Sequence, residues 1–403
     1  MQVLDLALKA YFELIKISIG TYKDDFDFSV LNDEQWNNVF EESKKQSTAL
    51  MCFDALKFVS AKPNDEIYNS WFLTASKILS NNIHVSNQQQ VLINVLNDNN
   101  IPYAILKGLS SAFYYPNGEY RNSGDIDFIV LSKDVETTKE LLLKNDYSMH
   151  RDVNPVHYEF HKNGARYELH RRISGIPDNS YGKIFEKELC NIIKECVMVN
   201  NFNKPGDYHH GIIIFLHTMH HILCNGIGLR HLCDWACFVN RTIGYSFWGE
   251  QLIPLLKKTG TYKFMCGITL ASVKLFDIVK PSWCNEELDE MVETIINEVI
   301  SAGNFGRKKP RQPSLIMTRK DSGKNSAFSK MCAMIKALNR TNAYICPLIK
   351  KVPIIYPFLM IYRVFRYLIL MCIGKKTSLI EISKFADERN AVYTKYQLYK
   401  TDK

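Results

Sequence analysis

The stretch Tyr103–Val130, YAILKGLSSAFYYPNGEYRNSGDIDFIV, carries more information about fold and chemistry than any other part of this chain. Near its end, Asp125 and Asp127 are separated by one apolar residue and lead into a strand-like apolar run. Because residues i and i+2 of a β-strand point to the same side, the two carboxylates lie next to each other while Ile126 and Phe128 face a core. Two like charges held this close are unfavourable without an offset. The usual offset is a divalent cation, and ligands that offer only oxygen suit Mg²⁺ or Mn²⁺.

The first half of the stretch predicts a phosphate-binding turn. An apolar run, Ile101–Leu106, ends at Lys107-Gly108-Leu109-Ser110. Backbone amides, a hydroxyl and a lysine can meet a phosphate group at such a turn. A phosphate-binding turn and a metal-binding carboxylate pair, joined by a short connection of helix size, together indicate nucleotidyl transfer.

A predicted β-hairpin supplies a third carboxylate. Residues 156–172, VHYEFHKNGARYELHRR, form two alternating segments around Asn163-Gly164, a strong signal for a tight turn. Parity puts Arg166, Glu168, His170 and Arg172 on one face of the second strand, and Tyr167 and Leu169 on the other. If this strand lies beside that of the aspartates, Glu168 helps to hold the metal and orients or deprotonates an attacking hydroxyl group.

Five motifs follow one another in a set order: Leu106-Lys107-Gly108, Tyr115-Pro116, Arg121, Gly124-Asp125-Ile126-Asp127 and Glu168-Leu169-His170. In this order the chain resembles the uncharacterised bacterial nucleotidyltransferase family of the DNA polymerase β superfamily. Two departures stand out. The usual Gly-Ser doublet is Gly108-Leu109-Ser110 here, which leaves open whether Ser110 or Ser111 contacts phosphate, and the third acid is Glu instead of the commoner Asp.

The resemblance implies an α+β fold: a nucleotidyltransferase palm, with a mixed sheet and helices on one face, between N-terminal and C-terminal helical regions. It also implies a nucleotide site around the metal-binding acids. Its expected residues are Lys107, Gly108, Ser110, Arg121, Gly124 and His170, with Arg121 a weaker candidate for contact with phosphate.

The similarity continues from His217 to Val239, through a His-rich helix. In the family picture His217, His220, Arg230 and Asp234 face the cleft and contact base, ribose or triphosphate. Packing of polar residues explains each of them equally well, and Arg230 and Asp234 are spaced for an ion pair within one helix. The histidines, with Cys224, His231 and Cys233 nearby, also suggest zinc. Ordinary packing is favoured, because zinc needs ligands from well-separated turns and no Cys-x-x-Cys partner is present.

A chain of 403 residues normally forms two or more domains. We expect an N-terminal helical region over 1–95, the palm over 96–200, a helical domain packing on the palm over 201–300, and a basic C-terminal helical region over 301–403. The N-terminus lacks the basic start and cleavage site of a secretory signal. Eleven scattered cysteines, mostly within apolar helical runs, favour reduced thiols and a cytoplasmic location.

Positive charge is concentrated in residues 301–376, which contain sixteen Lys and Arg and one acid and so carry a net charge of +15. The whole chain is +8, so the remainder is −7. This asymmetry suggests an anionic partner: triphosphate, an RNA acceptor or another nucleic acid, or an anionic membrane surface. Within it, 352–374 is nearly long enough to span a bilayer, but Arg363 and Arg366 each cost about 2.5–3.5 kcal/mol in its middle. We therefore expect no transmembrane segment. The default is a helix packed on the protein with its arginines in water, and the third option is attachment at the inner membrane face.

The sequence thus predicts a metal-dependent enzyme that moves an NMP group from an NTP, such as ATP, to an acceptor hydroxyl and releases pyrophosphate. Asp125, Asp127 and Glu168 bind one or two Mg²⁺ ions, with Mn²⁺ as a substitute. No RNA-binding module is recognisable, which favours a small molecule or a protein as acceptor. The alternative is a non-catalytic nucleotide-binding or interaction protein on the same fold, whose basic tail docks on an anionic partner.

Overall fold

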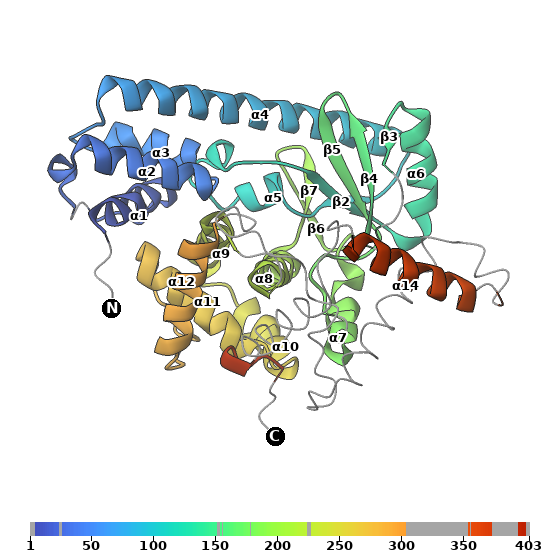
Figure 1. The fold of residues 1–403 in the computed structure, drawn as a ribbon. Coiled ribbons are helices and arrows are strands. Elements are labelled where there is room, and N and C mark those ends of the chain that lie inside the picture. Colours follow the sequence, from blue (N-terminus) through green and yellow to red (C-terminus); the bar gives the residue numbers. More distant parts are fainter. Residues whose placement is uncertain are drawn as a thin grey trace.

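The computed structural model describes residues 5–23, 26–150, 154, 156–177, 179–223, 227–303, 354, 356–372 and 394–399. Helices α1 (Leu6–Ile19), α2 (Asp33–Lys45) and α3 (Ala49–Ala55) lead into the long α4 (Asp65–Asp98). With 34 residues, α4 is about 51 Å long, and it runs along the top of Figure 1 from the N-terminal helices to the sheet. Its start is fixed by Asn64, whose side chain accepts a hydrogen bond from the Ile67 amide. The mixture of helices with one larger sheet confirms the predicted α+β class.

Five strands form a mixed sheet in the spatial order β1 (Tyr103–Ile105), β2 (Ile126–Val130), β5 (Ala165–His170), β4 (His157–Lys162) and β3 (Ser148–Met149). Strands β2 and β5 run parallel, and the other neighbouring pairs run antiparallel. The hairpin between β4 and β5 turns at Asn163 and Gly164, both with positive φ, as the Asn-Gly signal predicts. The four longer strands of this sheet are where the sequence predicts them, whereas the two-residue β3 was missed.

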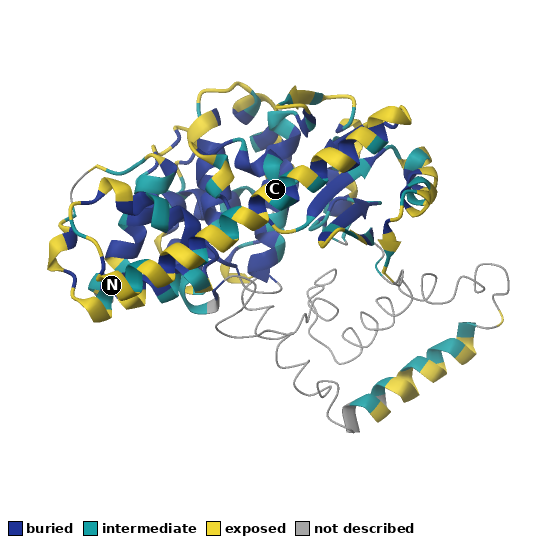
Figure 2. Ribbon diagram, turned by 90° about the horizontal axis from the view of Figure 1, so that it is seen from above, coloured by how far each residue is buried: buried dark blue, intermediate teal, exposed yellow. Residues whose placement is uncertain are grey.

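The two faces of the sheet differ. Ile126 and Phe128 point into an apolar cluster with Val85 and Leu92 of α4 and with Leu142 of α6 (Val135–Lys144). This confirms the prediction of helices on one face. Figure 2, viewed from above, shows exposed residues along the outer side of α4 and buried residues beneath it. The other face carries the acidic side chains.

The remaining described elements are mostly helical. They are α5 (Leu109–Ala112), α7 (Ser180–Glu188), the two-stranded sheet of β6 (Cys196–Val199) and β7 (Phe202–Pro205), α8 (Asp207–Leu223), α9 (Leu229–Thr242), α10 (Ile253–Lys258), α11 (Tyr262–Phe276) and α12 (Asp289–Ala302). One apolar cluster extends from Ala7 in α1 to Val299 in α12. The regions predicted as 1–95 and 201–300 therefore share a core, and the domain boundaries themselves stay a prediction.

Near the C-terminus, Tyr396 and Leu398 are buried in this same core, and the Tyr399 amide donates to the Gly260 carbonyl over 2.7 Å. Of the basic region 301–376, residues 304–353, 355 and 373–376 lie outside the described residues. Its described helix, α14 (Tyr356–Cys372), leaves Phe358, Phe365 and Ile369 more than half exposed (Figure 2). The packed apolar face that the sequence analysis expects is therefore not seen. Among the described helices, none has both the length and the apolar character needed to cross a membrane.

Candidate active site

Three carboxylates lie at adjacent positions of the central strand pair. Asp125 comes directly before β2 and Asp127 lies within it, while Glu168 lies on β5. The parallel pairing sets Asp127 opposite Glu168. Strand alternation then points Asp127, Glu168 and His170 away from the apolar face that carries Ile126 and Tyr167. Glu168 therefore lies beside the aspartates, as the parity argument requires.

Protein cations offset these negative charges. The Lys107 ammonium is 2.7 Å from Asp127 Oδ1, and His170 Nε2 donates to the same oxygen over 2.9 Å. The Arg166 guanidinium donates to Glu168 Oε1 over 2.5 Å and lies 3.8 Å from Asp125 Oδ2. From the sequence, the expected offset was a divalent cation. In the structure Lys107, His170 and Arg166 supply it.

Asp125 and Asp127 differ in protonation behaviour because their surroundings differ. Burial and the neighbouring Asp127 and Glu168 raise the pKa of Asp125, and the charge of Arg166 only partly opposes this. Burial would also raise the pKa of Asp127, but Lys107 and His170 outweigh it and lower that pKa well below its ordinary value. Burial lowers the pKa of His170, yet its hydrogen bonds to Asp127 and Glu168 produce a net rise. Asp127 and His170 thus form a buried ion pair, and Asp125, which is more exposed, takes up a proton more readily than Asp127.

The carboxylate cluster offers the donor atoms that a hard divalent cation takes. Arg166 contacts both Asp125 and Glu168, and His170 contacts both Asp127 and Glu168, so the three acids lie around two shared cationic side chains. Carboxylate oxygens are the donors that Mg²⁺ and Mn²⁺ prefer. His157 Nδ1 lies 3.3 Å from Glu168, and the donor atoms of His157, Glu168 and His170 lie within 4.8 Å of one another. We assign His170 to orienting the acids, because an imidazole paired with Asp127 holds its proton.

The predicted phosphate-binding turn connects β1 to α5. Gly108 there has φ +61° and ψ −114°, a conformation that side-chain-bearing residues rarely adopt. Lys107, one residue earlier, reaches the carboxylates. The Ser110 hydroxyl is fully buried and donates to the Ile105 carbonyl over 2.5 Å. The contact of Ser110 or Ser111 with phosphate stays a prediction, as does that of Gly124.

Two other residues predicted to contact the nucleotide, Arg121 and Asp234, form hydrogen bonds with each other. Arg121 donates two hydrogen bonds to the Asp234 carboxylate over 2.6 and 2.7 Å, and the Tyr115 hydroxyl donates a third over 2.7 Å. Arg121 and Asp234 are 5% and 7% exposed. Asp234 thus pairs across elements with Arg121, while Arg230 donates to the Asn122 carbonyl. This network fixes the segment that enters β2, and a direct role in nucleotide binding stays a prediction.

The histidines of α8 and α9 come together more closely than the sequence analysis expected. The His217 and His221 Nε2 atoms are 3.1 Å apart, and the His231 ring centroid is 5.2 and 4.5 Å from theirs. Burial lowers the pKa of all three well below the ordinary value, and nearby cations, Lys107 among them, add to this effect. The three imidazoles are therefore uncharged at neutral pH. His220, whose pKa burial also lowers, is half-buried beside them.

Sequence reasoning missed three contributors to the site. Arg166 and His157 contact the acids, and Asn82 of α4 holds the segment that leads to Asp125. The Asn82 side chain donates to the Glu119 and Arg121 carbonyls over 2.8 and 3.1 Å and accepts from the Ser123 amide over 2.9 Å. The strand parity that identified Glu168 as the third acid also places Arg166 on the same face of β5. Nothing in the sequence indicated Asn82, because its partners are 37 to 41 residues away.

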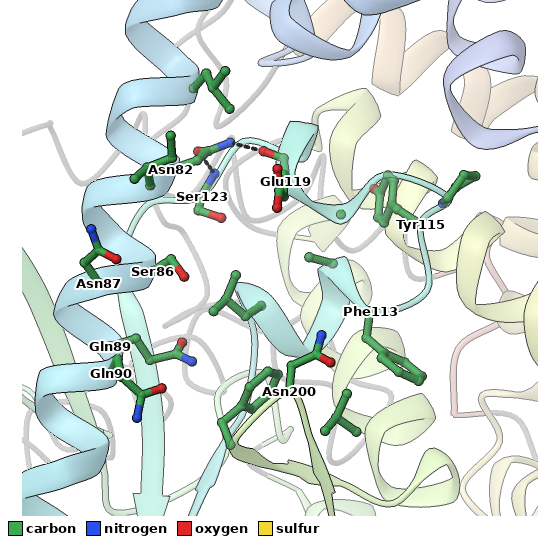
Figure 3. Close-up of a pocket in the computed structure, with 18 of the residues that line it drawn as sticks. Asn82, Ser86, Asn87, Gln89, Gln90, Phe113, Tyr115, Glu119, Ser123 and Asn200 are labelled. Atoms are coloured by element: carbon green, nitrogen blue, oxygen red, sulfur yellow. Dashed lines mark hydrogen bonds between the residues drawn. The ribbon is translucent and has the colours of Figure 1, made fainter.

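A pocket of about 790 Å³ lies between α4, the segment before β2 and the turn of the β6–β7 hairpin. Figure 3 shows Ser86, Asn87 and Gln90 of α4 on one side and Asn200 of the hairpin on another. Ser123, two residues before Asp125, and Leu109, next to Gly108, also line it. The polar part of the lining consists mainly of carboxamides and hydroxyls, with one acid, Glu119, and one base, Arg241, and it includes none of the three acids of the cluster.

The fold and the carboxylate cluster define the class: a nucleotidyltransferase palm with helical flanks. A family model described as "Uncharacterised nucleotidyltransferase" matches residues 32–277, and the chain belongs to that family. The match extends from the start of α2 to the end of α11, so it includes the sheet and the histidine helices. The resemblance indicated by the sequence motifs is confirmed. A search of curated proteins finds no match to the chain.

Proposed function

We propose that this chain transfers an NMP group from an NTP to an acceptor hydroxyl and releases pyrophosphate, in a reaction that depends on Mg²⁺ or Mn²⁺. The observation that carries the proposal is the convergence of Asp125, Asp127 and Glu168 beside the Lys107-Gly108 turn. Membership of an uncharacterised nucleotidyltransferase family supports the general reaction, nucleotidyl transfer.

In this mechanism Asp125, Asp127 and Glu168 would hold the metal, which would supply positive charge to the attacking and leaving oxygens. Lys107 leaves Asp127 for the β and γ phosphates, since a triphosphate carries more negative charge than one carboxylate. Arg166 orients Glu168 through its hydrogen bond to Oε1, and Glu168 accepts the proton of the acceptor hydroxyl. His170 holds Asp127 in place when Lys107 moves.

The acceptor that the pocket fits best is a small neutral polyol, such as a sugar. Carboxamide and hydroxyl groups from Asn87, Gln90, Ser86 and Asn200 offer uncharged donors and acceptors, and the lining adds one negative and one positive side chain, Glu119 and Arg241, whose charges sum to zero. The change of Gln90 to Leu should raise the KM for such an acceptor and leave release of pyrophosphate into water unchanged. An unchanged acceptor KM would remove the pocket from the proposal.

The test of the reaction is metal-dependent pyrophosphate release from each NTP. Asp125→Asn, Asp127→Asn and Glu168→Gln should each lower the rate at least about a hundredfold, whereas Asp134→Asn, on the turn after β2, should not. Binding of NTP that needs Mg²⁺ but never yields pyrophosphate would instead favour the non-catalytic alternative.

We also propose that the basic C-terminal region attaches the protein to the inner face of an anionic membrane from the cytoplasm. The exposed Phe358, Phe365 and Ile369 of α14 lie in residues 301–376, whose net charge is +15. Co-sedimentation with phosphatidylserine vesicles, abolished by Phe358→Ser/Phe365→Ser and absent with phosphatidylcholine vesicles, is the expected result. Binding to RNA but not to vesicles would overturn this part.

A further inference from the structure

Helices α8 and α9 bring three imidazoles to one point. His217 and His221 are one helical turn apart on α8, and His231 is in the first turn of α9. The ring centroids are 4.5, 4.5 and 5.2 Å apart, and one nitrogen of each ring lies within 4.8 Å of the other two. From the sequence, ordinary packing was favoured over zinc because ligands from well-separated turns were not evident. The structure supplies them from two helices.

The geometry is close to that of a bound metal ion. Two imidazole nitrogens that share a tetrahedral zinc ion, each at about 2.0–2.1 Å, are roughly 3.4 Å apart. The His217 and His221 Nε2 atoms are 3.1 Å apart, and small rotations of the rings would complete the set. His221 and His231 are buried, while His217 is only partly buried. The fourth coordination position is therefore left to water or to an oxygen of a bound ligand.

We propose that His217, His221 and His231 form a binding site for one transition-metal ion of the zinc type, separate from the carboxylate site. Imidazole nitrogens suit zinc, cobalt, nickel and copper, whereas Mg²⁺ prefers oxygen. The two sites thus select different metals. Lys107 links them, since its ammonium contacts Asp127 and its charge acts on all three histidines.

Bound metal would tie α8 to α9 next to the phosphate-binding turn. Without metal, the hydrogen bond between His217 and His221 is the alternative use of the same nitrogens. The two states differ in a measurable way, because only the first gives stoichiometric metal binding and a metal-dependent rise in stability.

The experiment uses the full chain without an affinity tag, stripped with chelator and titrated with Co²⁺ in the presence of excess Mg²⁺. We expect one Co²⁺ per chain, a visible absorption band of four- or five-coordinate cobalt, and displacement of the band by Zn²⁺. Both His221→Gln and His231→Phe should weaken binding at least about tenfold, the lower limit for loss of a group that merely supports a ligand. The matched control is His209→Gln, which removes another buried histidine of α8 and should keep the band.

Circular dichroism and thermal melting of each metal-free variant establish that it is folded. One folded histidine variant, His221→Gln or His231→Phe, is enough for the test. Asp127→Asn must keep the cobalt band even if it abolishes pyrophosphate release, which separates this site from the proposed catalytic one. Absence of a stoichiometric band, its survival in a folded His221→Gln or His231→Phe protein, or its loss in Asp127→Asn alone would overturn the proposal.

Discussion

Arg121 and Asp234 form a buried ion pair. Removing one partner should lower the stability of the protein strongly, whereas removing both partners should lower it only moderately. Arg121→Met deletes two hydrogen bonds to Asp234 and leaves that carboxylate buried with the hydrogen bond from the Tyr115 hydroxyl. Breaking a buried pair from one side costs about 3–5 kcal/mol, because the other charge is left uncompensated. The double change Arg121→Met/Asp234→Leu removes both charges. It leaves the Tyr115 hydroxyl without its acceptor, which should lower the free energy of unfolding by about 1–3 kcal/mol.

Urea denaturation of the wild type, both single variants and the double variant measures these free energies of unfolding. The double variant should be more stable than Arg121→Met alone, a coupling that additive effects cannot give. If each single change costs less than about 1 kcal/mol, or the double equals their sum, the pair is not the stabilising unit inferred here.

The pair of Arg121 and Asp234 also makes the stability of the protein depend on pH. Burial raises the pKa of Asp234, but the charge and hydrogen bonds of Arg121 outweigh it and lower the pKa. A carboxylate with a lowered folded-state pKa contributes stability that is fully present above its unfolded value, about 3.9, and is lost as the pH falls through the folded value. The difference in unfolding free energy between wild type and Asp234→Asn should therefore shrink below about pH 4. A constant difference from pH 7 to pH 3 would contradict it.

Three further changes probe the turn and the segment around the acids. Gly108→Ala forces a side chain into a strained conformation and should cost about 1–3 kcal/mol, measured by urea denaturation, together with weaker NTP binding; an unchanged stability would count against the conformation. Ser110→Ala should cost about 1 kcal/mol through its lost hydrogen bond to Ile105 and leave the KM for NTP within about twofold, so a large KM rise would mean that its hydroxyl reaches phosphate. Asn82→Ala frees the segment before Asp125 and should lower kcat with little change in the KM for NTP, whereas Asn69→Ala, an exposed asparagine of the same helix, should not lower kcat.

The part of the fold that follows from alternation could be predicted from the sequence. Strand parity placed Ile126 and Phe128 in the core and Glu168 with the aspartates, because one residue of shift would have reversed every side chain. The short strands β3 and β7 could not be predicted. The first has two residues, and the second contains Pro205 and the buried Lys204, whose ammonium lies 2.8 Å from Asp207 Oδ1. A buried lysine depends on partners that only the fold supplies.

The electrostatics of the site were the least predictable part. The sequence indicated which carboxylates meet but not that Lys107, Arg166 and His170 would neutralise them. In the same way, spacing within α8 was visible for His217 and His221, while the approach of His231 required the packing of α8 on α9. Contacts between elements far apart in sequence decide both features.

The most direct test of nucleotidyl transfer follows the phosphates themselves. NTP labelled at the α-phosphate and NTP labelled at the γ-phosphate are incubated in parallel with wild type and with Asp127→Asn, in Mg²⁺ and in EDTA. Nucleotidyl transfer predicts that the α label appears in NMP or in an acceptor adduct and the γ label in pyrophosphate, both only with metal and wild-type protein. Release of the γ label as free phosphate, or equal turnover by Asp127→Asn, would contradict it.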